Sequence, residues 1–277
     1  MAFPVARPPM DLTAVDGIEL DIHDRGSGEP VVFVHGGSTD ECYAVIQEPA
    51  LAERFRVIHY QRRGWGRSSH DGLPLSIQQQ SADCRAVMLH SGIDRAHLVG
   101  LSYGGAILLQ FALDYPDAVH SLALVEPGLP GELEDPELGT AFEEAIALYA
   151  AGDKEGTVRT AFGAICGESF EATFDQTLPA GWFERWVADV DTLFLHDLPA
   201  LESWEFTADD AARIDAPVLN MTGSDSKFQG AYETIQSWIP HAEPVMVGGA
   251  THCIFEMAPQ GAAERLAKFF SHHPFQR

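Results

Sequence analysis

A glycine-flanked serine is the first candidate for chemistry in this sequence. Residues 100–104 are Gly-Leu-Ser-Tyr-Gly, which matches the G-x-S-x-G pattern of a serine on a sharp turn between a strand and a helix. Such a turn projects the hydroxyl above a sheet, and small glycines relieve the crowding that it creates. Because an apolar run precedes the motif and helical spacing follows it, we expect Ser102 to be a nucleophile. The alternative is a tight turn with an inert serine.

His252 is the candidate base. A serine hydroxyl is a poor nucleophile until a neighbouring base removes its proton, and in this type of site the histidine lies late in the chain. The glycine-rich residues 248–252 follow the last apolar strand pattern and precede a helical pattern at 259–270, so His252 can reach over the carboxyl edge of a sheet. The histidines at 59, 97 and 196 lack this context, and we expect core or surface roles for them.

Two backbone amides are needed to stabilise the negative charge that develops during acyl transfer. One comes from the residue after the nucleophile, here Tyr103, and the other from a loop after an earlier strand. His-Gly-Gly-Ser at residues 35–38 ends such a strand, and Gly37 is the expected donor because glycine lets the backbone approach a substrate closely. A flexible strand-end loop without this role is the alternative.

Five segments spread along the chain resemble the α/β-hydrolase family. They are VVFVHGG, YQRRGWGRS, VGLSYGG, TGSD and GGATHC, at residues 31–37, 60–68, 99–105, 222–225 and 248–253. One departure is visible, because Gln61 stands where relatives often carry an aspartate. That segment is usually structural, so the departure leaves the expected catalytic residues in place. The resemblance implies an α/β-hydrolase fold with a serine nucleophile.

The acid that would orient His252 has two candidates. Relatives usually carry it as G-x-x-D after the strand equivalent to residues 216–221, but the third residue after Gly223 is Ser226, and Asp225 is one position short. Glu126 follows the strand at 121–125. Its position resembles that of the acid in family branches that carry it after the sixth strand, including some haloalkane dehalogenases and lactone hydrolases. We favour Glu126 and keep Asp225 as the alternative, since a glutamate before Pro127 could also be a solvated strand end.

A serine at position 102 excludes the dehalogenation and epoxide opening that proceed through an aspartate nucleophile. We expect hydrolysis of a carboxylic ester, lactone or similar acyl bond of a small molecule through an acyl-enzyme, with no metal or organic cofactor. Two alternatives stay open. One is hydrolysis of a carbon–carbon bond in a β-diketone-like substrate, and the other is a non-catalytic small-molecule receptor on the same fold.

The elements that must position these residues alternate along the chain. Apolar or alternating runs predict strands at 18–23, 31–34, 56–60, 96–101, 121–125, 216–221 and 243–247, and helical spacing predicts helices at 76–92, 103–115 and 259–270. This alternation is typical of a mostly parallel sheet that is flanked by helices. The fold class expected is therefore α/β, with the α/β-hydrolase arrangement.

One interval breaks the alternation. From about residue 127 to about residue 212 the chain is acidic, aromatic and helical in pattern, which predicts an inserted helical cap. The core would then comprise residues 1–126 and 213–277, with the cap at 127–212. We expect the aromatic residues of the cap to form its interior and in part to line a pocket. They are Phe142, Tyr149, Phe162, Phe170, Phe174, Trp182, Phe183, Trp186, Phe194 and Trp204.

Composition limits the partners and the location. The 277 residues are 45% apolar and 21% charged, which is typical of a globular protein. Seventeen basic against 41 acidic residues give a formal net charge of −24, which disfavours nucleic acid and anionic membranes as partners.

No segment has the roughly 18 apolar residues of a membrane span or the about 7–15 of a secretory signal core. We predict a cytoplasmic protein with a small-molecule acyl substrate, as a monomer or a homo-oligomer.

The four cysteines are widely separated. Cys42, Cys84, Cys166 and Cys253 contain no C-x-x-C pair, which gives no indication of a zinc site or of a disulfide framework. We therefore expect four reduced thiols.

Overall fold

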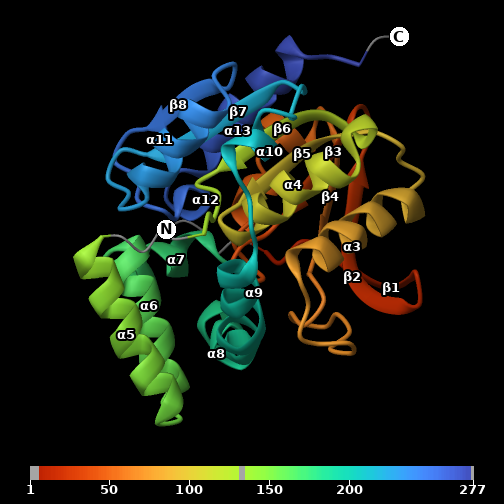
Figure 1. Ribbon diagram of the computed structural model, residues 1–277. Coiled ribbons are helices and arrows are strands. Elements are labelled where there is room, and N and C mark those ends of the chain that lie inside the picture. The colour runs from red at the N-terminus through yellow and green to blue at the C-terminus, as the bar shows by residue number, and fades with distance from the viewer. Residues whose placement is uncertain (1–5, 131–134, 276–277) are drawn as a thin grey trace.

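The protein is described by a computed structural model over residues 6–130 and 135–275. Eight strands form one sheet in the order β1-β2-β4-β3-β5-β6-β7-β8 (Figure 1). The strands are β1 (Asp11–Val15), β2 (Ile18–Gly26), β3 (Pro30–Val34), β4 (Arg56–Tyr60), β5 (Ala96–Leu101), β6 (Val119–Val125), β7 (Val218–Gly223) and β8 (Glu243–Val247).

The sheet is parallel from β4 through β8 and antiparallel at one edge. β1 pairs with β2, and β2 with β4, in antiparallel register, whereas every other pairing is parallel. The central strands are continuous apolar runs because both faces of the sheet are covered, and all six residues of β5 are buried. The predicted α/β fold class is confirmed.

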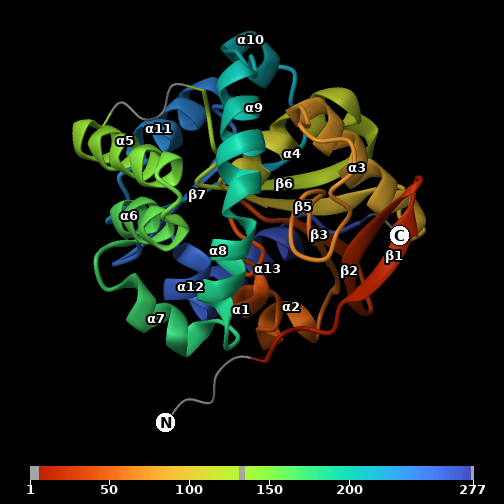
Figure 2. The ribbon, with the colours of Figure 1, turned by 90° about the horizontal axis from the view of Figure 1, so that it is seen from below.

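Helices form a layer on each face of the sheet. α3 (Ile77–His90), α4 (Tyr103–Asp114) and α11 (Gln229–Trp238) pack on one face, and α1 (Tyr43–Ile46), α2 (Pro49–Ala52), α12 (Ile254–Met257) and α13 (Pro259–His272) pack on the other. Figure 2 shows the sheet between these two layers. A short 3-10 turn, η1 (Pro116–Ala118), ends α4 at the proline that the sequence marks as its stop.

Parallel strands bring the loops that follow them to one edge. His35 follows β3, Ser102 follows β5, Glu126 follows β6, and His252 lies in the loop after β8. Since β3, β5, β6, β7 and β8 are consecutive neighbours in the sheet, residues as distant in sequence as 35 and 252 share its carboxyl edge. This edge is where a ligand binds in open α/β sheets.

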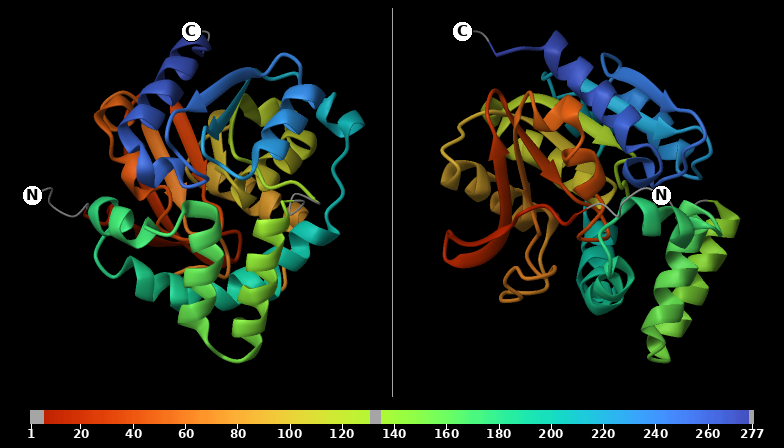
Figure 3. Two further views of the ribbon diagram at one scale, coloured as in Figure 1. Left: turned by 90° about the vertical axis from the view of Figure 1, so that its left-hand side faces the viewer. Right: turned by 180° about the vertical axis from the view of Figure 1, so that it is seen from behind.

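Every described element between β6 and β7 is a helix. These are α5 (Pro136–Ala150), α6 (Lys154–Cys166), α7 (Phe170–Thr177), α8 (Trp182–Thr192), the π-helical turn η2 (Leu193–Asp197), α9 (Leu198–Ser203) and α10 (Ala208–Ala211). Most of them lie together at one end of the molecule, beyond the carboxyl edge of the sheet (Figures 1 and 3). They share an interior of their own, in which Phe170, Phe174, Trp182 and Trp186 pack together.

The last part of this segment packs on the sheet domain instead. Trp204, Phe206 and Ala211 belong to the same buried cluster as α4 and α11. The division at residues 127 and 212 remains our proposal for the domain boundaries. Residues 1–5 and 276–277 of the predicted core and residues 131–134 of the predicted cap lie outside the described residues.

Candidate active site

Ser102 occupies a strained turn between β5 and α4. Its backbone has φ 51° and ψ −122°, a conformation that L residues rarely adopt. The turn is anchored to the neighbouring strand β6 through the Ser102 amide, which donates to the Val125 carbonyl at 3.0 Å. Glycine is required on either side, since a Cβ on Gly100 would lie 2.5 Å from the Gly104 carbonyl and one on Gly104 would collide with the Val34 carbonyl. The strain therefore fixes the serine over the sheet edge.

The loop after β3 is held from behind by Arg62. The guanidinium donates to the carbonyl of Gly36 at 2.7 Å and to that of His35 at 3.2 Å, and the Arg62 amide donates to Nε2 of His35 at 3.0 Å. Burial, together with the charge of Arg62, keeps the pKa of His35 well below its usual value, so the ring is neutral and can accept this bond. Gly37 lines the cavity in front of Ser102.

Arg62 is itself neutralised by the cap. Its guanidinium forms an ion pair with Asp197 of η2 at 2.6 Å, and both side chains are almost fully buried. Asp197 also accepts from the Trp65 indole at 3.0 Å, and the guanidinium lies 4.6 Å from the Tyr103 ring centroid. Because removal of one partner of a buried pair costs about 3–5 kcal/mol, this contact ties the cap firmly to the loop after β3.

Glu126 carries the carboxylate that meets His252. Its Oε2 lies 2.8 Å from His252 Nδ1 and accepts the Ser226 hydroxyl at 2.6 Å, while Oε1 accepts the Thr222 hydroxyl and the Gly223 amide, each at 2.7 Å. Like Ser102, Glu126 has positive φ, at 46°. The residue is 2% exposed, so its charge must be satisfied by these four donors.

The charge state of Glu126 follows from two opposing effects. Burial alone would raise the pKa of the carboxyl, but the hydrogen bond and charge of His252, with the Ser226 hydroxyl and Gly223 amide, bring the pKa below its ordinary value. The group is therefore ionised at neutral pH. Its contribution to stability is present above the unfolded-state pKa and is lost as the pH falls through the lowered folded-state pKa.

The alternative acid, Asp225, lies elsewhere. It is exposed, and its Oδ1 accepts the hydroxyl of the adjacent Ser224 at 2.8 Å. The structure thus brings Glu126 to His252 and leaves Asp225 on the surface.

The His252 ring also packs on the ring of Phe228, with ring centroids 4.4 Å apart. A carboxylate at Nδ1 and an apolar ring against its face restrict the orientation of the imidazole. This arrangement leaves Nε2 as the nitrogen able to exchange a proton with the cavity. His252 is 7% exposed and lines the same cavity as Ser102.

This cavity has a volume of about 580 Å³ and walls from both the sheet edge and the cap. Its polar lining comes from Ser102, His252, Glu41 and Glu202, together with the backbone of the loop after β3. The rest of its wall is apolar and includes Leu129, Pro130, Phe142, Ile146, Phe162, Ile165, Leu193, Leu198, Leu201 and Phe228. Of the ten aromatic cap residues named from the sequence, Phe142 and Phe162 line it. Tyr149, Phe170, Phe174, Trp182, Phe183, Trp186 and Phe194 pack inside the cap, and Trp204 packs on the sheet domain.

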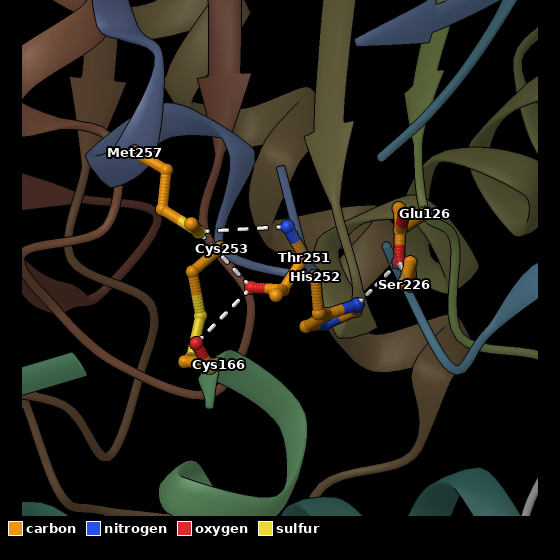
Figure 4. Close-up of a disulfide and its surroundings, with 7 residues drawn as sticks. All are labelled: Glu126, Cys166, Ser226, Thr251, His252, Cys253 and Met257. Atoms are coloured by element: carbon orange, nitrogen blue, oxygen red, sulfur yellow. Dashed lines mark hydrogen bonds and ion pairs between the residues drawn. A yellow bond between two sulfur atoms is a disulfide. The ribbon is translucent and has the colours of Figure 1, made fainter. Parts of the chain in front are cut away.

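The expectation of four reduced thiols is wrong. Cys166, at the end of α6, forms a disulfide with Cys253, whose Cα lies 5.4 Å away (Figure 4). Thr251 adds a hydrogen bond from its hydroxyl to the Cys166 carbonyl at 3.3 Å. Cys42 and Cys84 are free and buried. The pairing escaped sequence analysis because the two cysteines are 87 positions apart and only the fold of the cap brings them together.

Two further site residues were not selected from the sequence for a role. Ser226 was noted only as the residue that stands where many relatives have the acid, yet it donates to Glu126. Glu41, six residues after His35, lines the cavity and accepts the Gly36 amide at 2.7 Å. Its place shortly after His-Gly-Gly and directly before the apolar residues 42–46 is the one signal that could have indicated Glu41.

Neither a metal cluster nor a membrane span was found within residues 6–130 and 135–275. No three His, Cys, Asp or Glu side chains of these residues gather as metal ligands would, and none of the helices described is long and apolar enough to cross a bilayer.

Comparison with known proteins gives one family and several relatives. Residues 29–259 match the family model of the alpha/beta hydrolase fold. The chain is 26% identical over 260 residues to a non-heme haloperoxidase of Rhodococcus erythropolis, and the aligned region covers 87% of this chain and 92% of that protein. It is 34% identical over 145 residues to a 2-hydroxy-6-oxo-6-phenylhexa-2,4-dienoate hydrolase of Burkholderia cepacia. That aligned region covers 49% of this chain and 50% of the relative. Among solved structures, Est816, an N-acyl homoserine lactone degrading enzyme, is 26% identical with a TM-score of 0.72, covering 94% of this chain and 100% of its own.

The disulfide can be tested by removing it. The double variant C166S/C253S should lower the free energy of unfolding by about 2–4 kcal/mol, because the bond closes a long loop between the cap and the His252 segment. Urea denaturation followed by circular dichroism measures this difference. A reducing agent should destabilise the wild type to a similar extent and leave the double variant unchanged. Equal stability of the wild type with and without reductant, or alkylation of Cys166 in the unreduced protein, would contradict the pairing.

Proposed function

Because this chain belongs to the α/β-hydrolase family, we propose that it is a serine hydrolase that cleaves a carboxylic ester or lactone of a small molecule. The observation that carries the proposal is the meeting of three features in one cavity. Ser102 lies on its strained turn, His252 lines the same cavity, and Glu126 bonds to the far nitrogen of that histidine. This is the arrangement of nucleophile, base and orienting acid that acyl transfer requires.

The first half-reaction would form an acyl-enzyme. His252 takes the hydroxyl proton as Oγ of Ser102 bonds to the acyl carbon, and the carbonyl electron pair moves onto oxygen. The backbone amides of Gly37 and Tyr103 would hold this oxyanion. When it collapses, the bond to the alcohol leaving group breaks and the imidazolium supplies the proton that the leaving oxygen needs. Glu126 stabilises the charged imidazole throughout without taking a proton itself.

The second half-reaction would release the acid. His252 deprotonates a water molecule that attacks the acyl carbon, the same amides hold the second oxyanion, and Ser102 leaves with the proton from the imidazolium. The chain's own residues supply every proton transfer in this sequence, and water is the co-substrate. In a lactone the leaving alcohol stays attached to the acyl group, so one molecule of hydroxy acid forms.

The cavity favours an apolar substrate around a polar reacting centre. Apolar side chains such as Phe142, Phe162 and Leu193 form most of its wall, and its polar lining includes Ser102 and His252. This distribution of lining groups suits a molecule with a hydrocarbon part and one acyl linkage. The likeness to Est816, which is described as degrading N-acyl homoserine lactones, supports a lactone within this class.

A second candidate is hydrolysis of a carbon–carbon bond next to a ketone. The observation that favours it is the 34% identity to the hydroxy-oxo-phenylhexadienoate hydrolase over about half of each chain. Product identification separates the candidates, because an ester yields an acid and an alcohol whereas a β-diketone yields an acid and a ketone.

A cytoplasmic location also stays a proposal, and the disulfide between Cys166 and Cys253 weighs against it because such bonds persist in oxidising compartments.

The nucleophile is tested with a fluorophosphonate probe and short-chain p-nitrophenyl esters. Labelling should map to Ser102 by mass spectrometry, S102A should lose labelling and about 10⁴-fold or more of ester turnover, and H252A should label far more slowly. Circular dichroism should show that both variants stay folded. An S102A protein with near-normal turnover would refute the assignment. No labelling of the wild type would instead favour the non-catalytic receptor.

The acid is tested with a matched pair of amide variants. E126Q should lower kcat by up to about 10⁴-fold, because an amide at this position cannot stabilise the imidazolium and favours the wrong tautomer. D225N should keep activity within about two-fold, since the Asp225 side chain is exposed and, among the described residues, accepts a hydrogen bond from its neighbour Ser224 alone. Steady-state kinetics on the same ester measures both. The reverse result, with D225N inactive and E126Q active, would make Asp225 the acid.

A further inference from the structure

Glu41 is a buried carboxyl group in the cavity wall that the proposed mechanism leaves unused. It lies in the loop between β3 and α1 and is 6% exposed. A glutamate is rarely buried to this extent without a charged partner, yet no ion pair of Glu41 occurs among the described residues. It therefore needs a physical explanation of its own.

The carboxyl group is hydrogen-bonded to the loop after β3. Its Oε2 accepts the Gly36 amide at 2.7 Å. Oε2 and the Ser102 Cβ each lie 2.9 Å from the point that a Cβ on Gly36 would occupy, so the glutamate and the nucleophile lie on two sides of Gly36. Glu41 thus holds the residue that directly precedes Gly37.

This pattern of contacts affects the direction of the Gly37 amide. The Gly36 amide is turned toward the Glu41 carboxyl group, which fixes the peptide unit next to Gly37. Gly37 lines the cavity in front of Ser102, where a substrate oxygen would be held. A side chain that fixes the neighbouring amide therefore helps to preorganise the donor that matters in the transition state.

The electrostatic surroundings favour a neutral Glu41. Burial raises the pKa of this carboxyl to about 7, even though the Gly36 amide, His252 and Arg62 all favour its charged form. Arg62 offers limited compensation because its own charge is paired with Asp197 at 2.6 Å. Near neutral pH the group changes between an uncharged acid and a carboxylate.

The other groups that face Glu41 do not replace this charge. Glu256, on α12, is 1% exposed, and burial and the charge of Glu41 raise its pKa well above the ordinary value, so it remains protonated when Glu41 ionises. Its Oε2 has no hydrogen-bond partner in the described part of the chain. Cys42 is a neutral thiol, since burial raises its pKa well above the usual value, and His35 is a neutral ring.

We propose that Glu41 is a positioning residue for the oxyanion hole, which it preorganises as a neutral acid and weakens when it becomes a carboxylate. In the neutral state it accepts the Gly36 amide and adds no charge. In the ionised state it sets a negative charge beside the place where the substrate oxygen becomes negative, in a buried site where such repulsion is strong. The inference rests on the proposed role of Ser102 and adds a pH limit to it.

The sign of the pH effect follows directly. Below about pH 7 Glu41 is protonated and the oxyanion hole works at full strength. As the pH rises above that value, the fraction of neutral Glu41 falls, so the reactivity of Ser102 should decline by up to about ten-fold per pH unit until the residual rate of the ionised form is reached. Glu126 affects the acid side of the profile instead, because its active form is the deprotonated one and its pKa lies below the ordinary value.

The experiment measures the rate at which a fluorophosphonate labels Ser102 between pH 5 and 9.5. Labelling forms the Oγ–phosphorus bond and releases fluoride, while His252 takes the hydroxyl proton, so it reports the nucleophile and oxyanion hole without a known substrate. E41Q keeps an acceptor for the Gly36 amide but stays neutral, and should retain wild-type labelling at pH 6 without the decline above pH 7. E41A loses the acceptor and should label about 10- to 100-fold more slowly at every pH, approaching the cost of deleting an oxyanion donor.

E256Q is the matched control. It removes the neighbouring carboxyl and leaves Glu41 in place, so it should keep the alkaline decline. Thermal unfolding of all three variants shows that the comparison is made on folded protein. An alkaline decline that persists in E41Q or disappears in E256Q would overturn the proposal, as would equal labelling of E41A and E41Q. Failure of the proposed function looks different, because then wild-type Ser102 would not be labelled at any pH.

Discussion

Four hydrogen-bond donors converge on the buried carboxylate of Glu126, and much of the architecture serves to bring them there. Two come from the end of β7, one from Ser226 in the loop that follows, and one from His252 after β8. A buried charge with fewer donors would be neutralised or would destabilise the fold. The carboxylate is thus the point at which three consecutive strand ends are fixed in relation to one another.

The same need for compensation connects the cap to the sheet. Arg62 holds the carbonyls of the loop after β3, and its charge is neutralised by Asp197 of η2. In the same loop, Asp40 is fully buried and is paired with Arg185 of α8 at 2.6 Å. The disulfide from Cys166 to Cys253 adds a covalent link beside His252. The loop after β3 and the loop that carries His252 are therefore both attached to the cap that lines the pocket.

Sequence analysis predicted what depends on local pattern. The bounds of β4, β5 and β8 were predicted to the residue. For β4 and β5 the reason is burial on both faces of the sheet, which leaves a short, mostly apolar run. β8 is largely exposed at the edge of the sheet, and its bounds followed from its short apolar run alone. The strained turn at Ser102 was predictable because glycines are required around it. The pairings of Arg62 with Asp197 and of Cys166 with Cys253 join residues 135 and 87 positions apart, and no local pattern indicates them. The role of Glu41 was equally hidden, since it depends on the neighbours that the fold places around its carboxyl.

Sheet topology explains why Glu126 lies against His252 and Asp225 does not, which spacing along the sequence does not reveal. β6 and β7 are parallel neighbours with Val125 opposite Met221, so the residues just beyond both strands lie under the same histidine. A carboxylate can reach Nδ1 from either strand end, and the sequence offers one candidate at each. In this chain the position after β7 that relatives often fill with the acid holds Ser226, whose hydroxyl donates to Glu126 instead. Ser226 thus complements Glu126: with the carboxylate at the end of β6, a donor at the position after β7 is favourable, because a second carboxylate there would face the first across a buried site.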